Sequence, residues 1–443
     1  MKRYPVYETE DKLPGTKEIP AHWGVVRNSF IFKEISETGY GHLELLSILS
    51  DRGIVKQSET GRKERAPEDR SSYKRILKGD IGYNLMNAFS GSIGVSNYEG
   101  IISPAYAVCR PKVEIDGNYF HYLFRTDLYL TEFDRYAYGI MYERNRLYFE
   151  DFKRIYVPFP PLEEQKQIAR FLDLKLEQID HFISNKQRLI ELLKEQKTAI
   201  VNHVVTKGLN PHAPMKASGI EWLGEIPAHW EVKSFRRVTT RIEVGIAEAA
   251  THAYTDKGIP IIRSTNVKTN FIELDNILHI QKWFADKNRS KYIYMGDILT
   301  VRTGANAGMT SVVPKELNHS QCFTLLISTP SPQHLPQFYS FYINSPMGQE
   351  FFSIEGWGAA QVNLSVPILQ NLPVVEPPYE EQQAIVSFIE KESEKIDQAI
   401  AKVEKEIELI QEYRTTLISD AVTGKIDVRE PSAVEPTLTA AGI

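Results

Sequence analysis

Two stretches of the chain carry apolar residues at helical spacing, one after Pro161 and one after Pro378. Within each stretch the apolar positions recur at steps of three and four, with occasional steps of seven, and no proline or glycine interrupts them. These positions are Ile168, Leu172, Ile179, Ile183, Ile190, Leu193, Ile200 and Val204 in the first stretch and Ile385, Ile389, Ile396, Ile400, Val403, Ile407, Ile410 and Leu417 in the second. A heptad pattern that persists over about five repeats predicts a long amphipathic helix in each stretch.

The segments that precede the two helices have a different pattern. Short β-like runs, IGYNLMN at 81–87 and YAVCRP at 106–111, are broken by glycine, proline and asparagine, and the second segment has DILTVRT at 297–303 and TLLIST at 324–329. Such runs predict globular segments of mixed α and β structure. Each helix then opens with a Pro-Pro-x-Glu-Glu-Gln motif. Proline suits the first turn of a helix and the glutamates suit its positive dipole end, and these glutamates are Glu163, Glu164, Glu380 and Glu381.

The pattern of a globular segment followed by a long helix occurs twice in the chain. IPAHW at 19–23 returns at 226–230, KGDI at 78–81 corresponds to MGDI at 295–298, PPLEEQ at 160–165 to PPYEEQ at 377–382, and HVVTKG at 203–208 to DAVTGK at 420–425. The IPAHW pair is offset by 207 residues and the later pairs by 217, so the second copy carries ten additional residues between its IPAHW and GD motifs. A period this long indicates a duplicated pair of a globular segment and a helix, not a solenoid repeat.

A free amphipathic rod would expose its apolar stripe, so we expect the two helices to pack against each other. Two copies of one unit that meet through one kind of surface favour a twofold arrangement, and hence an antiparallel pairing. The predicted fold is α+β, with two globular α/β-mixed domains joined by two long helices that pair as an antiparallel coiled coil, and with a pseudo-twofold internal repeat. The predicted boundaries are 1–157 and 210–373 for the two domains, 158–209 and 374–425 for the central and C-terminal helical spacers, and 426–443 for a polar, disordered tail.

The order of these motifs resembles that of the specificity subunits of type I restriction–modification systems. The resemblance is carried by both IPAHW openings, by LLSILSDRGIV at 45–55 and YNLMNAFSGSIGVSNYEGIISPAYAV at 83–108, and by PIIRSTNV at 260–267 and GDILTVRTGANAGMTSVV at 296–313. It implies a non-catalytic, sequence-specific DNA-binding subunit with two target recognition domains, each of which reads one half of a bipartite site in double-stranded DNA. It also implies that the helices space these domains and dock two copies of an adenine methyltransferase subunit, together with restriction or motor subunits where the system also cleaves. S-adenosylmethionine would then belong to the methyltransferase, and this chain would bind no cofactor.

Charge and cysteine usage modify this interpretation only slightly. The formal net charge of −5 is unusual for a DNA-binding protein, but residues 374–443 hold 15 acidic and 7 basic residues, while the rest of the chain is nearly balanced. A balanced domain can still present a basic face. The two cysteines lie far apart in sequence and form no zinc-site or disulfide pattern, and the chain has no signal-peptide pattern and no apolar run long enough to span a membrane. We therefore expect a cytoplasmic protein.

EPPY at 376–379 suggests a different function, because it resembles the catalytic tetrapeptide of adenine-N6 methyltransferases. Its counterpart in the first copy, FPPL at 159–162, lacks both the polar residue and the aromatic ring, and both tetrapeptides lead directly into a helix. No glycine-rich motif for a methyl donor precedes either of them. We therefore interpret the prolines as a helix start. A self-contained methyltransferase and a coiled-coil tether that binds protein remain the two alternative functions.

Candidate DNA contacts lie near two glycine-rich loops, SGSIG at 90–94 and TGANAG at 303–308. Neither is followed by Lys-Ser or Lys-Thr, which argues against a nucleotide P-loop and leaves either a tight turn or a turn whose N–H groups bind DNA phosphate. Arginine suits guanine, asparagine suits adenine and lysine suits phosphate. The predicted DNA-binding residues are Lys56, Arg62, Lys63, Arg65, Lys74, Arg75, Asn84 and Asn87 in the first domain and Arg263, Ser264, Asn266, Lys268, Arg302, Thr303 and Asn306 in the second.

The IPAHW motifs contain the remaining candidate groups. We expect Trp23 and Trp230 to be core anchors, and His22 and His229 to pack or cap locally and not to bind a metal.

Overall fold

The computed structural model describes residues 2–61, 69–139, 145–248, 251–355 and 363–429. It forms two compact units. Unit 1 comprises Met1–Lys186 and Lys405–Ile443, and unit 2 comprises Gln187–Glu404. Each unit thus contains one globular segment and part of each long helix. Arg62, Lys63 and Arg65 and the tail from residue 430 onward lie outside the described residues.

Unit 1 is built around a four-stranded antiparallel sheet in the order β4-β11-β8-β9. Smaller antiparallel pairs, β1-β2, β3-β12, β5-β6 and β7-β10, surround it. The strands are β1 (Tyr7–Thr9), β2 (Glu18–Pro20), β3 (Gly24–Arg27), β4 (Phe32–Ile35), β5 (Leu46–Leu49), β6 (Gly53–Lys56), β7 (Lys74–Ile76), β8 (Ile81–Asn84), β9 (Ile93–Val95), β10 (Gly100–Ile102), β11 (Tyr106–Pro111) and β12 (Tyr156–Phe159). The runs at 81–87 and 106–111 that the sequence predicts as strands are therefore confirmed, the first over its initial four residues.

Short α-helices complete the described globular part of unit 1. They are α1 (Asn28–Ile31), α2 (Gly117–Leu123), α3 (Asp127–Tyr136) and α4 (Phe149–Phe152). The N-terminus of α2 is capped by Asp116, whose carboxylate accepts a hydrogen bond from the Tyr119 N–H at 2.9 Å. Aromatic rings join the sheet to these helices: Phe32 of β4 lies 5.5 Å from Phe120, and Tyr83 of β8 lies 5.1 Å from Phe152, measured between ring centroids. This aromatic core fixes β8 and β9, which carry the first glycine loop between them.

Unit 2 repeats the central sheet, in the order β16-β26-β23-β24, and adds a five-stranded sheet in the order β17-β21-β18-β25-β22. Its strands are β13 (Met215–Ala217), β14 (Glu225–Pro227), β15 (Glu231–Ser234), β16 (Thr239–Val244), β17 (Tyr254–Thr255), β18 (Ile259–Ile262), β19 (Val267–Lys268), β20 (Phe271–Ile272), β21 (Leu278–Ile280), β22 (Tyr292–Ile293), β23 (Ile298–Thr300), β24 (Thr310–Val312), β25 (Ser320–Cys322), β26 (Leu326–Pro330) and β27 (Pro373–Glu376). Its short helices are α6 (Lys282–Lys287), α7 (Pro336–Asn344), α8 (Pro346–Glu355) and α9 (Val366–Asn371). The predicted strands at 297–303 and 324–329 correspond to β23 and β26.

The two central sheets share one register, which confirms the predicted internal repeat. Ile81 pairs with Cys109 in unit 1, and Ile298 pairs with Ser328 in unit 2. Ile81 and Ile298 are 217 residues apart, the offset at which the GD motifs repeat. A residue of one sheet can therefore be matched to its counterpart in the other.

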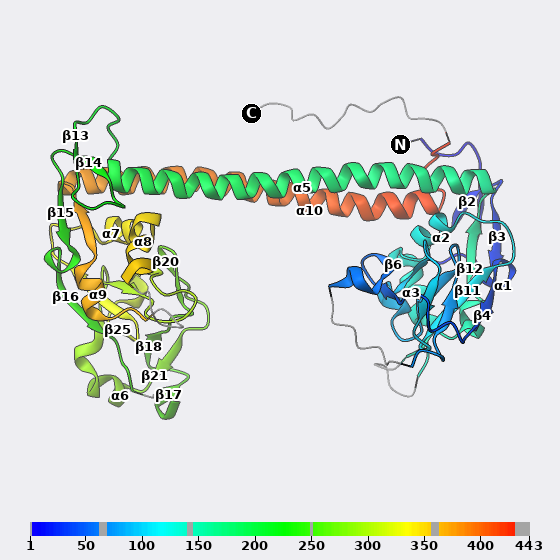
Figure 1. Ribbon diagram of the computed structural model, residues 1–443, viewed down its shortest axis with the longest axis horizontal. Helices are drawn as coiled ribbons and strands as arrows, with labels where there is room; N and C mark the ends of the chain where they lie inside the picture. Colours follow the sequence, from blue (N-terminus) through cyan, green and yellow to red (C-terminus); the bar gives the residue numbers. More distant parts are fainter. Residues whose placement is uncertain (1, 62–68, 140–144, 249–250, 356–362, 430–443) are drawn as a thin grey trace. The chain divides into compact units, whose positions relative to one another are not determined.

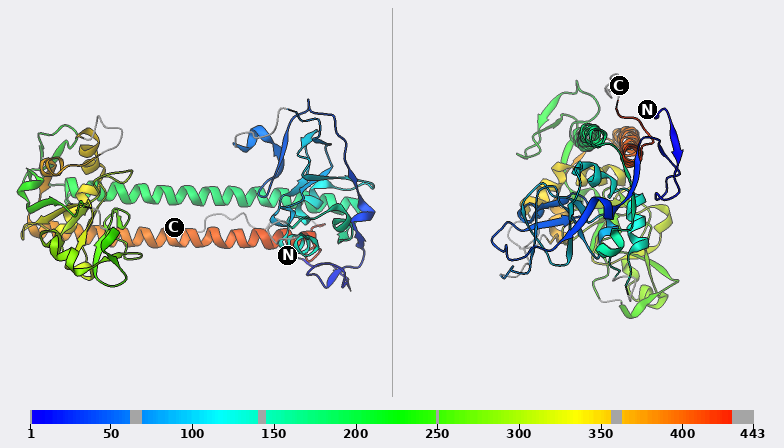
Figure 2. Two further views of the ribbon diagram at one scale, coloured as in Figure 1. Left: turned by 90° about the horizontal axis from the view of Figure 1, so that it is seen from below. Right: turned by 90° about the vertical axis from the view of Figure 1, so that its right-hand side faces the viewer.

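The two predicted long helices are present as α5 (Leu162–Lys207) and α10 (Tyr379–Val422). Within unit 1, Asp180 pairs with Arg414 at 2.5 Å and Lys186 with Glu406 at 2.7 Å, so residue numbers rise along one helix as they fall along the other. Within unit 2, Lys197 pairs with Asp397 at 2.7 Å. The segments of the two helices run side by side in each unit (Figure 1 and Figure 2). The pairing is antiparallel, as predicted.

The repeated IPAHW and EEQ motifs meet each other in both units. In unit 1 the imidazole of His22 lies 2.8 Å from the carboxylate of Glu164, in the first turn of α5. In unit 2 His229 is 2.8 Å from Glu381, and Trp230 donates its indole N–H to the same carboxylate at 3.0 Å. The histidines thus bind the start of a helix, which agrees with the predicted local capping role. The two tryptophans are buried core anchors, as expected.

The same junctions also hold the ends of the helices. Gly208 follows α5 and Gly424 follows α10, both with a positive φ that ends a helix without strain for glycine. A Cβ on Gly424 would lie 2.5 Å from Pro20 of the first IPAHW motif, and one on Gly208 would lie 3.2 Å from Trp230 of the second. Each junction therefore joins the start of one long helix to the end of the other.

Residues 426–429 were predicted to belong to a disordered tail, but they pack against the N-terminus of unit 1. The Asp427 N–H donates to the Lys2 carbonyl at 2.8 Å, and the Arg429 guanidinium lies 4.6 Å from the centre of the Tyr4 ring. No described helix is both long and apolar enough to cross a membrane.

Candidate DNA-binding surfaces

The glycine loop of unit 1, at 90–94, forms a closed turn between β8 and β9. Gly91 has φ +86°, and the N–H groups of Gly91, Ser92 and Ile93 donate to carbonyls within the loop at 3.0, 3.2 and 2.8 Å. Arg125 donates to the carbonyls of Gly91 and Ser50, at 2.8 and 2.6 Å. Burial lowers the pKa of this guanidinium. Because these donors are occupied, the structure supports the turn interpretation here and not a phosphate cradle.

The equivalent loop of unit 2, at 303–308, has two backbone donors for which the described residues offer no partner. Gly304 and Gly308 have φ of +94° and +92°, and the N–H groups of Ala307 and Gly308 are bonded within the turn at 3.1 and 2.9 Å. The N–H groups of Ala305 and Asn306 have no hydrogen-bond partner among the described residues. Ala305 and Asn306 are exposed to solvent. This loop can therefore donate backbone hydrogen bonds to an anion such as a DNA phosphate.

The predicted cations of unit 1 that the structure describes already have partners within the protein. The Lys56 ammonium is 3.1 Å from Glu44, and the hydrogen bond that it donates to this carboxylate raises the pKa of Lys56. Lys74 donates to the carbonyl of Tyr106 at 2.7 Å. Arg75 donates to Glu99 at 3.0 Å and lies 4.5 Å from the centre of the Tyr40 ring. The exposed ion pairs can exchange a carboxylate for a phosphate, but they are not free cations in the unbound chain.

The two predicted asparagines of unit 1 differ in exposure. Asn84 ends β8, and its side-chain oxygen accepts the Met86 N–H at 3.0 Å, so it shapes the turn. Asn87 is exposed, and its carbonyl accepts the N–H groups of Ser90 and Ser92. The side chain of Asn87 is thus the better placed of the two to meet a ligand.

In unit 2 the predicted group at 263–268 forms the turn that follows β18. Asn266 is 3% exposed, and its side-chain oxygen accepts the Arg263 N–H at 3.1 Å, so this amide holds the turn. The Arg263 guanidinium donates to the Asn276 carbonyl at 3.3 Å. Ser264 is exposed, and Lys268 lies 3.2 Å from Glu273. Arg263, Ser264 and Lys268 therefore reach the surface, whereas Asn266 faces the protein.

The other predicted group of unit 2 lies at the glycine loop. Arg302 donates through its Nε to the Asn363 side chain at 3.1 Å and to the Leu364 carbonyl at 3.2 Å. Thr303 and Asn306 are exposed on the loop itself. The Ser311 hydroxyl, three residues beyond the loop, donates to the Lys268 carbonyl of β19 at 2.6 Å, so the fold brings the two predicted groups of unit 2 together.

Sequence reasoning missed Arg125, which fixes the unit 1 loop from the segment between α2 and α3. No local motif marks this residue, since its partners lie more than thirty positions away along the chain. It also missed the exposed Phe271 and Leu274 of unit 2, because a single apolar residue in a polar segment does not indicate its orientation.

The EPPY tetrapeptide lies at a strand–helix junction. Glu376 ends β27 and accepts a hydrogen bond from His334 at 2.8 Å, and it also pairs with Lys233. Burial raises the pKa of Glu376, but the hydrogen bonds from Lys233 and His334 outweigh it, so the net pKa is lowered. The Pro377 carbonyl accepts the Gln382 side-chain amide at 2.9 Å, as the Pro160 carbonyl accepts that of Gln165 in unit 1.

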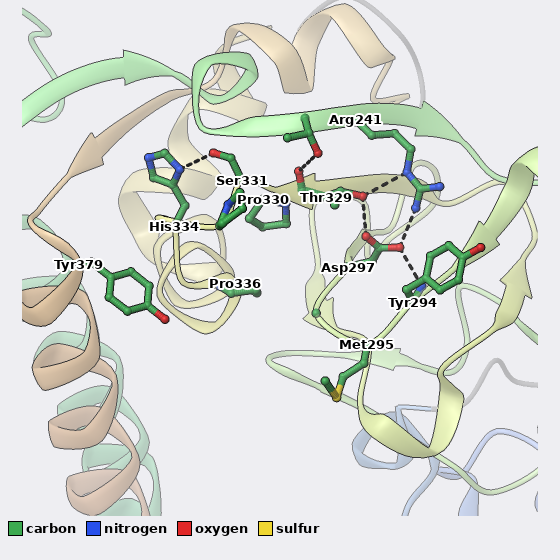
Figure 3. Close-up of a pocket in the computed structure, with 13 residues that line it drawn as sticks. Arg241, Tyr294, Met295, Asp297, Thr329, Pro330, Ser331, His334, Pro336 and Tyr379 are labelled. Atoms are coloured by element: carbon green, nitrogen blue, oxygen red, sulfur yellow. Dashed lines mark hydrogen bonds and ion pairs between the residues drawn. The ribbon is translucent and has the colours of Figure 1, made fainter.

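Tyr379 lines a pocket of about 480 Å³ next to this junction (Figure 3). The pocket wall also carries His334, bonded to Ser331, and Asp297, bonded to Arg241 and Thr329. The described residues hold no group of His, Cys, Asp and Glu side chains that could bind a metal ion. Both cysteines, Cys109 and Cys322, are buried and unpaired, and burial raises the pKa of each thiol.

Comparison with known proteins identifies one family. The sequence model of the type I restriction modification DNA specificity domain matches residues 58–195 and 240–409, once in each copy of the repeat. A putative type I restriction enzyme MjaX specificity subunit of Methanocaldococcus jannaschii is 26% identical over 431 residues, which cover 93% of this chain and 95% of that protein. The EcoKI specificity subunit of Escherichia coli K12 is 22% identical over 327 residues, with coverages of 72% and 68%.

Solved structures share the fold. A chain from a study of complex assembly and conformational transition of the type I R-M system superposes with a TM-score of 0.68 at 15% identity, over 93% of this chain and all of that chain. The HsdS subunit of Thermoanaerobacter tengcongensis gives a TM-score of 0.55 at 16% identity, over 93% and 99%. At such identities the likeness concerns the fold alone.

Proposed function

The chain belongs to the type I restriction–modification DNA specificity family, and from this membership we propose that it reads a bipartite DNA target, one half with each unit, and holds two methyltransferase subunits. Specificity subunits recognise DNA targets and assemble with the other subunits of their system. The proposal adds the division of the target between the two units and the number of methyltransferase copies.

One observation supports the division of labour above all. The two units have the same register in the central sheet, and each has one helix junction of the same kind. They differ at the loop after the equivalent strands β8 and β23. In unit 1 this loop is held by Arg125, and in unit 2 its residues Ala305 and Asn306 are exposed, with N–H groups that have no partner among the described residues. A shared scaffold with different surface groups is what two readers of different half-sites require.

The DNA contacts that we propose are the predicted residues that reach the surface. In unit 1 these are Lys56, Arg75 and Asn87, while Lys74 binds a carbonyl of β11 and Asn84 supports the turn after β8. In unit 2 Arg302, Thr303 and Asn306 lie on the loop, while Arg263, Ser264 and Lys268 lie beside it. Asn266 supports these groups from within the protein.

We further propose that the chain itself transfers no methyl group. In adenine methyltransferases the tetrapeptide must offer a polar side chain and a carbonyl to the target amine. Here both are occupied, Glu376 by His334 and Lys233 and the Pro377 carbonyl by Gln382. The methyl donor S-adenosylmethionine would accordingly bind to the methyltransferase subunit.

Two methyltransferase copies are favoured because the helix junction is present twice, with His22 and Glu164 in unit 1 and His229 and Glu381 in unit 2. Restriction or motor subunits would join the same assembly in a system that cleaves. A cytoplasmic location, which the two unpaired cysteines favour, stays a prediction.

The test is to produce the chain together with the methyltransferase subunit of its own system and to map N6-methyladenine in the DNA of the host cell. One bipartite motif should be methylated. Replacing residues 1–157 by those of a relative should change one half of the motif, and replacing residues 210–373 the other half. A single swap that alters both halves, or methylation by the chain alone, would contradict the proposal.

A further inference from the structure

Unit 2 contains a β-hairpin at a position where unit 1 has a short turn. In unit 1 the strands β5 and β6 are joined by residues 50–52. The corresponding strands of unit 2, β18 and β21, are joined by residues 263–277, which form the hairpin of β19 and β20 (Figure 1). The ten additional residues of the second copy lie in the interval that includes this hairpin. The hairpin is therefore a feature by which the two units differ within a shared fold.

The hairpin is held firmly on the protein side. Asn270, at its turn, has φ +66°, and its N–H donates to the Thr310 carbonyl at 3.0 Å. Its side-chain oxygen accepts hydrogen bonds from Ser340 and Asn344 of α7, at 2.9 and 2.7 Å. The Ser311 hydroxyl lies 2.6 Å from the carbonyls on both strands of the hairpin. Such a network of polar contacts fixes the hairpin relative to the central sheet and α7.

The outer side of the hairpin exposes two large apolar side chains. Val267 and Ile272 are buried, whereas Phe271 is 59% exposed and Leu274 is 49% exposed. Single exposed apolar residues are common on protein surfaces. Here, however, a dense set of hydrogen bonds holds two of them in one orientation, three residues apart. Exposed apolar side chains on a fixed hairpin can contact a ligand with little loss of conformational freedom.

Hydrogen-bond donors for an anionic partner lie in the loop that precedes β24, the strand to which the hairpin is anchored. The loop at 303–308 leads into β24, and β24 carries the Thr310 carbonyl that anchors Asn270. The N–H groups of Ala305 and Asn306 lack a partner in the part of the chain that the structure describes. The surface thus combines apolar side chains with backbone donors.

We propose that the hairpin at 267–274 and the loop at 303–308 form a ridge of unit 2 that enters the major groove of DNA. Among the described residues of unit 1 the hairpin has no counterpart. A two-stranded β-ribbon fits this groove, and apolar side chains there contact the methyl group of thymine. Phe271 and Leu274 contact base edges, and the loop N–H groups bind the adjoining phosphate. Elements that both units have in common are suited to binding the same partner subunit. The hairpin differs between the units, so it is suited to reading the half-site, which also differs. This inference rests on the proposed function.

The experiment compares Phe271→Ala with Trp283→Ala, both in the complete complex with the methyltransferase subunit. Trp283 is 52% exposed on α6 of the same unit, so it is a matched control outside the ridge. Affinities are measured for duplexes that carry the mapped site, the site with the unit 2 half randomised, and no site. Phe271→Ala should weaken binding to the intact site by roughly 5- to 100-fold, and Trp283→Ala should leave it within about twofold. Neither variant should change the affinity for a duplex without the site.

Three results would contradict the proposal that the ridge contacts bases. Unchanged affinity of Phe271→Ala for the intact site would exclude a base contact, and equal losses on every duplex would indicate a general defect. Failure of this variant to assemble with the methyltransferase would make the ridge a protein contact. If the wild-type complex itself shows no preference for any duplex, the proposed function fails, and this outcome is distinct because it appears without any substitution. Replacing thymine by uracil in the unit 2 half-site should weaken the wild-type complex and leave Phe271→Ala unaffected, whereas an equal effect on both would also count against the contact.

Discussion

Arg110 and Arg241 bind equivalent aspartates, but they do so from two neighbouring strands of the central sheet that are not equivalent. Arg110 lies on β11 and reaches Asp80 at 3.0 Å, whereas Arg241 lies on β16, the counterpart of β4, and reaches Asp297 at 2.6 Å. In the shared register the counterpart of Arg110 is Thr329, which pairs with Arg241 across the strands. Duplication has thus preserved the ion pair of the GD turn although the arginine changed strand.

This relationship predicts that the arginine of unit 2 can be moved from β16 to β26, the position that it has in unit 1. Arg241→Met leaves Asp297, only 2% exposed, without its cationic partner, and should lower the free energy of unfolding by about 3 kcal/mol. The double variant Arg241→Lys with Thr329→Arg copies the arrangement of Arg110 and Lys33 in unit 1, and should recover to within about 1 kcal/mol of the wild type. Urea unfolding followed by circular dichroism measures both. A double variant as unstable as Arg241→Met would show that the strands are not interchangeable.

His121 should make the stability of unit 1 depend on pH. Burial, with a smaller contribution from the charge of Arg125, lowers the pKa of His121 to about 4. The unfolded chain has a histidine pKa of about 6.5, so it binds a proton below that pH while the folded chain stays neutral. The free energy of unfolding should therefore fall as the pH drops from about 6.5 to 4, by at most about 3 kcal/mol.

The variant His121→Gln isolates this effect. The difference in unfolding free energy between the two proteins should be constant above about pH 7 and should change steadily below 6.5. Carboxylates titrate alike in both, so they cancel in the difference. Parallel curves over the whole range would show that His121 is protonated equally in the folded and unfolded states.

Sequence patterns determined the repeat, the two helices and their antiparallel pairing, because a heptad stripe and a fixed offset are properties of the sequence alone. The pattern could not reveal the long-range contacts, such as that of Glu164 with His22, although it marked both motifs as repeated. Among the candidate DNA contacts it could not separate the exposed Asn306 from the buried Asn266, since the same residue type serves a surface and a turn. Residue type indicates which groups a side chain can bind, but only the structure shows whether that side chain is exposed to a ligand.

Tyr379→Ala tests whether the Pro-Pro-Tyr sequence acts as a helix start or as a catalytic site. The ring is 41% exposed in the first turn of α10, so its loss should change the free energy of unfolding by no more than about 0.5 kcal/mol. The complex with the methyltransferase should methylate the same motif at an unchanged rate. Gln382→Leu should behave differently, because it removes buried hydrogen bonds to the Pro377 carbonyl and the Leu335 N–H, and should destabilise the protein by roughly 2–3 kcal/mol. Loss of methylation with Tyr379→Ala in a stable complex would revive the catalytic interpretation.

The apolar seam between the two long helices, which includes Ile396, Ile400 and Val403 of α10, should hold the helices in contact. Ile400 of α10 is 9% exposed, while its neighbour Ala401 is exposed, so the two positions separate the seam from the solvent face of one helix. Ile400→Asp removes a buried apolar side chain and places a carboxylate in an apolar contact, which should destabilise the helix pair by about 3 kcal/mol or more. Ala401→Asp adds the same charge on the solvent face and should change the stability by less than about 0.5 kcal/mol. Thermal unfolding followed by circular dichroism compares the two variants, and binding to the methyltransferase subunit is measured in parallel. Ile400→Asp should melt at a lower temperature and bind the subunit less well, because the antiparallel pairing supports both junctions. If the two variants melted together, the stripe at Ile396, Ile400 and Val403 would not be the surface that holds α5 and α10 in contact.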